Sequence, residues 1–434
     1  MNKEKQETDV RVENSVERHV TLPHAARRYS QLALFLSLAA IYLLIVISQV
    51  TIHPPGVGGG SHFIYLADGW LHGHLYVNDI PPGLADDTQY KGHWYVAFPP
   101  LPAILLLPVV AIFHLSYQAI ITLAFSVCMG VLNIWLMLQV LTRLVRNHAI
   151  GEKFATVAWL LVLFTLGTEL VYVTMKGSVW FVAHVVATTF LLLYMSEMFG
   201  KRRAWLAAIF LGLAALSRST TLFTFPFFLV LTFALERQQP LALARQWTIF
   251  GAVLGVFIVG MLLYNQARFG SLLDFGYNTM NVNPLVGKDL HTYGQFNKHF
   301  VRTNLRYMLL EPPKIINKFP YLTFNPFGTS IFLTMPALLF AFLGFRHREQ
   351  RWLAASLAAA CVLPVAALLL YFNTGWYQFG YRFALDFLPF LFSLAALGMS
   401  SHPTWREKLL ITLSVLLNLW GYFVFTYYHP PLLA

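Results

Sequence analysis

Charged side chains beside apolar segments are the strongest chemical candidates in this sequence, because a charge close to lipid is costly and marks functional positions. Two features stand out by type: the adjacent carboxylates Asp86 and Asp87, and the late cation Arg382. A carboxylate takes a proton from a hydroxyl or amine, and the forked donors of arginine suit a phosphate. The whole set of such candidates is Asp68, Asp79, Asp86, Asp87, Lys91, Lys176, Arg218, Arg268, Asp274, Arg382 and Asp386.

Arg382 has two interpretations. It lies four residues before Asp386, so the two side chains would share one helix face and could simply pair. Alternatively, its guanidinium faces a phosphate, with Gln378 and Tyr381 beside it. The sequence leaves both interpretations open.

Two further cations have structural alternatives. Lys176, shortly before Trp180, is either an interfacial anchor or part of the wall of a polar site. Arg218 lies between two apolar segments and either extends to the membrane interface or belongs to the same site. His53 and His93 have no partner at metal-ligand spacing. We expect no dedicated metal site, although a divalent cation on the Asp86–Asp87 pair stays open as an alternative.

The composition determines the elements that must position these groups. Of the 434 residues, 57% are hydrophobic and 11% are charged, whereas soluble domains carry about 25% charged residues. The chain is therefore expected to be an all-α integral membrane protein that crosses the membrane several times. The net charge of +11 does not indicate nucleic-acid binding, because the basic residues form short clusters between apolar segments.

The positive-inside rule selects a topology of eleven membrane spans, within a range of ten to twelve, with the N-terminus in the cytoplasm and the C-terminus outside. The Pro-studded segment 99–115 is predicted not to cross, because a crossing there would move every later basic loop to the outside. The predicted spans are Gln31–Val50, 117–141, 154–173, 179–199, 204–217, 219–235, 247–266, 328–345, 352–372, 380–399 and 409–427.

This topology divides the chain into a cytoplasmic tail, 1–30, one transmembrane domain, 31–427, and a short outer tail, 428–434. The domain carries two large outer loops. The first, 51–116, is expected to contain helices lying at the membrane interface, one of them between His62 and Gly73. The second, 267–327, is rich in aromatic residues and is expected to pack over the first.

Several stretches of the chain resemble the GT-C superfamily of membrane glycosyltransferases, in particular the bacterial protein mannosyltransferases and aminoarabinose transferases. The resemblance covers nearly the whole chain and depends on the order of the motifs. These motifs are Tyr65…Gly69…Gly73, Gly92…Tyr95…Pro99-Pro100, Gly212-Leu213-Ala214…Arg218, Tyr264-Asn265-Gln266-Ala267-Arg268-Phe269-Gly270, Asn325-Pro326-Phe327-Gly328 and Phe379-Gly380-Tyr381-Arg382…Asp386…Pro389.

The chain departs from the pattern of this superfamily at two positions. Many members begin the interfacial helix with an Asp-Glu pair, whose Asp is the general base, but Ser61 and His62 stand here. Phe98 replaces a lysine that often precedes the Pro-Pro pair and meets the lipid phosphate. The resemblance therefore implies that another acid serves, Asp87 first and Asp86 second, both just before the Gly92 motif. His62 is the remaining alternative base.

The resemblance implies transfer of a sugar from a polyprenyl-phosphate carrier to a lipid, glycan or protein acceptor. The membrane would be the cytoplasmic membrane, and the active face would be extracytoplasmic. The candidate substrate-binding residues are Arg382, Arg268, Lys176, Arg218, Tyr95 and His93. One alternative is a non-catalytic protein of this fold in the assembly of lipid-linked glycans. A transporter or flippase is a weaker alternative, because few charges lie at mid-membrane.

Overall fold

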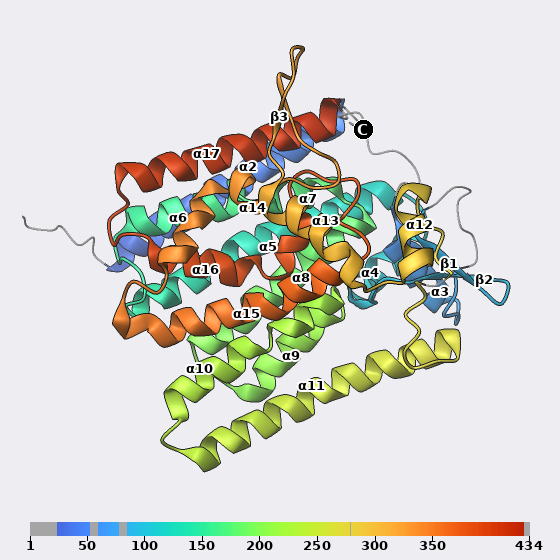
Figure 1. Ribbon diagram of the computed structural model, residues 1–434, viewed down its shortest axis with the longest axis horizontal. Coiled ribbons are helices and arrows are strands. Elements are labelled where there is room, and N and C mark those ends of the chain that lie inside the picture. The colour runs from blue at the N-terminus through green and yellow to red at the C-terminus, as the bar shows by residue number, and fades with distance from the viewer. Residues whose placement is uncertain (1–23, 53–59, 78–84, 278, 429–434) are drawn as a thin grey trace, which may run out of the picture.

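The computed structural model describes residues 24–52, 60–77, 85–277 and 279–428 (Figure 1). It is mostly helical, as the composition predicts, and its long helices run roughly side by side (Figure 1). The predicted tails lie mainly outside the described residues. The longest helices are α2 (His24–Ile52), α5 (Gln118–Arg146), α8 (Val179–Phe199), α11 (Pro240–Phe269), α15 (Arg351–Leu370) and α17 (Trp405–Phe423).

Seven segments of the described chain are long and apolar enough to cross a membrane: six that contain these helices, and Ser219–Glu236. The predicted span 154–173 is broken into α6 (Phe154–Leu166) and α7 (Leu170–Lys176), which meet at 44° and would make an eighth span. The remaining elements are shorter. They are α3 (His62–Leu71), α4 (Leu101–Phe113), α9 (Ala204–Ala215), η1 (Ser219–Thr224), α10 (Pro226–Glu236), α12 (Pro284–Tyr293), η2 (Lys298–Phe300), α13 (Val301–Leu305), η3 (Arg306–Leu310), α14 (Ile331–Thr334), η4 (Pro336–Leu343), η5 (Arg348–Gln350), η6 (Arg382–Asp386), α16 (Leu388–Gly398) and η7 (Val424–Tyr428).

Local sequence signals explain several helix ends. Helix α17 begins with a capping box, in which Thr404 and Glu407 bond each other's backbone amides. Helix α11 has a proline in its first turn and ends at Gly270, which adopts the left-handed conformation that favours glycine. Helix α7 ends at Gly177, also left-handed, where a Cβ would collide with the backbone of Leu123.

Contacts between helix ends give the bundle two distinct ends. At one of them Asn147, after α5, donates to the Phe199 carbonyl of α8 at 3.1 Å. At the other, Gln49 near the end of α2 donates to the Met175 carbonyl of α7 at 3.0 Å, and it accepts from Tyr422 of α17. Helix α2 therefore starts at the first end and α17 finishes at the second. The first and the last of the long helices therefore approach the same end of the bundle with their C-termini.

The segment between α2 and α5 begins and finishes at the same end of the bundle. Helix α5 starts beside α7, where Ser126 donates to the Thr174 carbonyl at 2.8 Å, and α2 finishes beside α7 too. Within this segment α4 packs mainly on α3. Whether 99–115 crosses the membrane stays a prediction, and α4 is a short apolar helix of 13 residues.

The strictly all-α expectation is wrong in detail, because two short antiparallel sheets interrupt the helices. One pairs β1 (Asp87–Tyr90) with β2 (His93–Val96) inside the first loop. The other pairs β3 (Lys314–Ile315) with β4 (Leu322–Thr323) inside the long loop. The first hairpin turns at Lys91 and Gly92, both with positive φ, the geometry that matches the twist of paired strands. A Lys-Gly pair is a weaker turn signal than Asn-Gly, so the sequence did not reveal it.

The expected packing of the long loop over the first loop is confirmed. Asp86 donates its backbone amide to Asn281 at 2.7 Å, and Asn281 donates to the Asp87 carbonyl at 2.8 Å. Thr88 adds a hydroxyl bond to the Gly276 carbonyl at 2.7 Å. The two loops therefore form one layer at the end of the bundle where α2 finishes.

This arrangement predicts which positions share a side of the membrane. Single cysteines replacing Arg146 and Lys201 should both be protected from a membrane-impermeant thiol reagent in intact cells, because α5 and α8 finish at one end. A cysteine replacing Lys91 in the β1–β2 turn should react, because it lies at the opposite end. External labelling at both 146 and 201 would contradict the predicted orientation.

Candidate functional site

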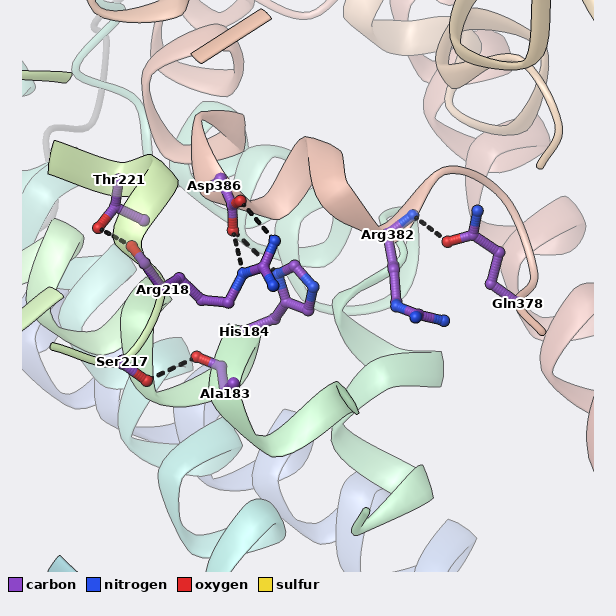
Figure 2. A network of polar contacts seen from close by, with 8 residues as sticks. All are labelled: Ala183, His184, Ser217, Arg218, Thr221, Gln378, Arg382 and Asp386. Carbon is purple, nitrogen blue, oxygen red and sulfur yellow. Dashed lines mark hydrogen bonds and ion pairs between the residues drawn. The ribbon is translucent and has the colours of Figure 1, made fainter. Parts of the chain in front are cut away.

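A buried carboxylate connects three segments that are distant in the sequence. Asp386 of η6 accepts two hydrogen bonds from Arg218, at 3.1 Å from Nε and 2.9 Å from Nη2. It also contacts His184 Nδ1 of α8 at 3.0 Å (Figure 2). Asp386 and His184 are fully buried. Because an ion pair in a dry interior is costly to break, this triad fixes the junction of α8, η1 and η6.

The triad corrects two interpretations of the sequence. The pairing of Arg382 with Asp386 is wrong, because the carboxylate is occupied by Arg218 and His184. Interfacial extension of Arg218 is also wrong, because its guanidinium turns inward to Asp386. Residues four apart would meet in an α-helix, but η6 is a 3₁₀ turn, and Figure 2 shows Arg382 pointing away from Asp386.

Arg382 is left without an ion pair among the described residues. Its guanidinium donates only two long bonds of 3.4 Å, to the carbonyls of Tyr377 and Trp376. It lies over the ring of Phe181 at 4.9 Å, and only 3% of the residue is exposed. A buried, unpaired guanidinium beside a cavity is a strong candidate for binding an anion.

Two buried side chains hold the backbone that carries Arg382. Gln378 accepts the Arg382 amide at 3.1 Å. Glu169, at the break between α6 and α7, accepts the Tyr381 amide at 2.6 Å. The Glu169 carboxyl lies so close to Gly380 that any Cβ there would overlap it, and Gly380 has a φ of 65°. The guanidinium is therefore presented by a rigid turn.

Asp86 lies opposite, at the start of the β1–β2 hairpin. Its φ is 68°, a left-handed conformation that aspartate tolerates better than most residues. Its Oδ2 accepts a hydrogen bond from Trp180 Nε1 at 2.6 Å. Burial raises the pKa of Asp86, while the Trp180 bond and the charge of Arg382 act in the opposite direction. The carboxylate is thus oriented and made more basic than an exposed aspartate.

Asp86 and Arg382 line the same two cavities. The larger one has a volume of about 430 Å³ and the smaller about 40 Å³. Both are lined by Asp86, Trp180, Asn373 and Arg382. The larger cavity adds Ala85, Tyr172, Lys176, Ser178, Phe181, Val282, Asn283, Trp376, Tyr377 and Phe425. Arg218, Tyr277 and Tyr371 are among the residues that the smaller one adds.

Asp87, the carboxylate that the sequence favours as a base, lies elsewhere. Only 1% of it is exposed, and it lines neither cavity. Neither of its oxygens has a hydrogen-bond partner among the described residues, and burial raises its pKa to about 7. His62 Nε2 lies 3.7 Å from Asp87 Oδ1 and 2.8 Å from the Ala85 carbonyl. Burial lowers the pKa of His62 to about 4, so this contact joins no imidazolium at neutral pH.

The other sequence candidates separate into two groups. Lys176 lines the larger cavity and donates to the Phe425 carbonyl at 3.1 Å. Arg268, Tyr95 and His93 line neither cavity. Arg268 donates to the Val96 carbonyl at 2.8 Å.

Arg268, Tyr95 and His93 attach the β1–β2 hairpin to its surroundings. Tyr95 packs against Phe269, and His93 stacks on Tyr76. Sequence analysis missed Asn373, Trp376 and Tyr377, because only the fold brings the 371–378 loop to the cavity.

The part of the chain that the structure describes contains no group of three or more His, Cys, Asp or Glu side chains placed to hold a metal ion. Asp86 and Asp87 do not act as a pair, because the first meets Trp180 and the second lies beside His62. The arrangement offers instead one carboxylate facing two cations, with aromatic walls. Such a site suits a ligand that carries both an anionic group and a ring.

The triad predicts a large loss of stability when its carboxylate is removed. Asp386→Ala should lower the free energy of unfolding by about 3–5 kcal/mol, because it leaves Arg218, whose side chain is 19% exposed, without its partner and removes the bond to the buried His184. Thermal or denaturant unfolding of the purified protein in detergent measures this, with exposed Glu349→Gln as the control. Arg218→Met combined with Asp386→Leu should recover part of the loss. Equal stability of Asp386→Ala and the wild type would contradict the assigned role.

Comparisons with known proteins add a likeness of fold. No protein-family model matches the chain, and no curated protein matches it in sequence. Among solved structures, the chain is similar to the apo form of the Archaeoglobus fulgidus oligosaccharyltransferase, with a TM-score of 0.50 and 13% sequence identity. The match covers 90% of this chain and 55% of that protein, so this chain spans about half its length. At this identity the likeness shows a shared arrangement of helices and no more.

Proposed function

We propose that the chain is a glycosyltransferase that moves a sugar from a polyprenyl-phosphate carrier to a lipid, glycan or protein acceptor. The observation that carries this proposal is the joint lining of one cavity by the Asp86 carboxylate and the unpaired Arg382 guanidinium. The oligosaccharyltransferase-like fold supports the same class of reaction. Proteins of one fold differ in function through the residues of their sites, and here Asp86 and Arg382 are those residues.

Arg382 and Lys176 are the proposed binding groups for the carrier phosphate. Both line the larger cavity, and Arg382 has no competing carboxylate partner among the described residues. Fixed cations stabilise the negative charge that grows on a leaving phosphate, and they do so most strongly where water is excluded. Trp180 and Trp376 supply aromatic walls, as is usual in cavities that enclose a small polar ligand.

Asp86 is the proposed general base, in place of Asp87. An acceptor oxygen or nitrogen attacks the anomeric carbon and passes its proton to Asp86 as the new bond forms. The bond from the anomeric carbon to the phosphate oxygen breaks, and its electron pair leaves with the polyprenyl phosphate. The hydrogen bond from Trp180 to Oδ2 holds the carboxylate in position for this step.

We also propose the membrane orientation. Eleven spans result when α9, α14 with η4, and η6 with α16 are added to the seven candidates and the bent pair. The N-terminus would be cytoplasmic, and the cavity would open on the extracytoplasmic face of the cytoplasmic membrane. Support comes from the basic loops, because Asn147 lies beside Phe199 and Gln350 beside His148 at the end of the bundle away from the cavity.

Matched substitutions separate the roles of the charged residues. Asp86→Asn should abolish sugar transfer from polyprenyl-phosphate sugars, because it removes the base and keeps the volume. The adjacent Asp87→Asn should retain transfer, since Asp87 lines neither cavity. Arg382→Ala should raise the KM for the donor, because it removes the phosphate contact.

Radiolabelled transfer by purified protein in lipid nanodiscs, with a panel of donors, measures all three variants. Retained transfer in Asp86→Asn together with lost transfer in Asp87→Asn would return the base to Asp87. Absence of transfer by the wild type with every donor would favour the non-catalytic alternative.

The pH profile should report the environment of Asp86. A base must be ionised, so activity should fall as the pH drops through the pKa of Asp86, above the value of about 3.9 for a free aspartate. Trp180→Phe removes a hydrogen bond that lowers this pKa. The acidic limb of kcat/KM should therefore move to higher pH in Trp180→Phe. A limb that stays in place would show that Asp86 does not control the profile.

A further inference from the structure

The β3–β4 hairpin lies on the outside of the helix bundle. Figure 1 shows it projecting crosswise from α17 instead of running along the bundle. Its ladder is short, with only Lys314 paired to Thr323 and Ile315 to Leu322. It plays no part in the candidate site, because none of its residues lines either cavity. Its exposed surface therefore needs a separate explanation.

The turn of the hairpin, residues 316–321, packs against the last turns of a candidate membrane span. Phe319 packs edge-on against Trp420 and Phe423, both at 6.1 Å between ring centroids, and against Tyr428 at 5.4 Å. Trp420 donates its Nε1 hydrogen to the Leu322 carbonyl at 2.9 Å. The span Trp405–Tyr428 finishes here. Tryptophan and tyrosine at the end of a span mark the depth of the membrane–water interface.

The surface of the hairpin is apolar, aromatic and basic at once. Ile315 is 86% exposed and Tyr321 is 61% exposed. Lys314 and Lys318 flank this apolar surface, and 312–328 contains no acidic residue. Lysine beside aromatic and aliphatic side chains is the composition of segments that lie among lipid headgroups. An almost fully exposed isoleucine is more favourable against acyl chains than in water.

The backbone of the hairpin rules out a position in the hydrocarbon core of the membrane. The sheet has only two strands, so each strand directs some of its N–H and C=O groups away from its partner, and unpaired groups of this kind are not tolerated in lipid tails. At headgroup depth, water satisfies the backbone while acyl chains cover the isoleucine. We propose that the 314–323 hairpin is an interfacial arm that lies in the headgroup layer, with Lys314 and Lys318 binding the phosphates of anionic lipids.

A fluorescent label tests the location of the arm. Ile315→Cys, in the full chain with Cys128→Ala and Cys361→Ala, carries an environment-sensitive nitrobenzoxadiazole group in nanodiscs. Its emission should be blue-shifted and quenched by doxyl-labelled lipid but not by aqueous iodide. Lys91→Cys in the β1–β2 turn is the matched control, because it lies on an exposed hairpin turn, and it should show the opposite pattern. Iodide quenching at 315 equal to that at 91 would overturn the proposal.

A lipid titration tests the phosphate contacts. Raising the share of phosphatidylglycerol over phosphatidylcholine should increase doxyl quenching at position 315, and Lys314→Gln with Lys318→Gln should remove that increase. An increase that survives the double substitution would refute the role of the lysines. Protection of the label in native membranes that is lost in nanodiscs of pure lipid would assign the surface to a protein partner instead. Unfolding temperature monitors folding, so a misfolded variant is recognised separately.

Discussion

The pairing of Asp386 with Arg218 and His184 is the interaction on which the candidate site depends. It brings a late turn, η6, against α8 and the start of η1, and two of its three members, Asp386 and His184, are fully buried. This pairing also decides which of the two arginines, Arg218 or Arg382, has a carboxylate partner. Because Asp386 is already bonded to Arg218 and His184, the neighbouring Arg382 forms no ion pair within the described residues, and its charge is available to a ligand. The same carboxylate thus connects the helices and determines which arginine is free.

The cavity forms where this junction meets the layer of loops. The β1–β2 hairpin supplies Asp86, and the long loop holds it through the backbone exchange with Asn281. From the other side, Glu169 and Gln378 fix the turn that carries Arg382. The Asp86 carboxylate and the Arg382 guanidinium are therefore held by separate parts of the chain. They come together only when the first loop and the long loop pack on each other. A site assembled in this way is preorganised, because the costs of orientation are met during folding.

The chain is similar in fold to an archaeal oligosaccharyltransferase. At 13% identity the two chains share an arrangement of helices and little of their sequence. Folds of this kind host sites that vary residue by residue. In the present chain, Ser61 and His62, which begin the helix of the first loop, are both buried. The proposed base, Asp86, comes instead from the hairpin further along the same loop.

The sequence by itself determined the membrane class, most of the long helices and the docking of two aromatic-rich loops. Apolar runs bounded by charges are local signals, so α8 was predicted at 179–199 as observed. The sequence did not predict the bend after Leu166 or the β1–β2 hairpin, because short breaks and Lys-Gly turns have weak local signatures. The sequence also placed Asp86, Arg382, Lys176 and Arg218 among the candidates by charge alone.

Only the tertiary structure decided how those charges are used. Arg218 and Asp386 are 168 residues apart, so no spacing rule could pair them. The neighbours Asp86 and Asp87 are equivalent in sequence, but one meets Trp180 at the cavity and the other is enclosed beside His62. Arg268 turns out to hold the hairpin. The physical reason is that the partners and burial of a charge depend on distant segments, whereas helix formation in lipid depends on the segment itself.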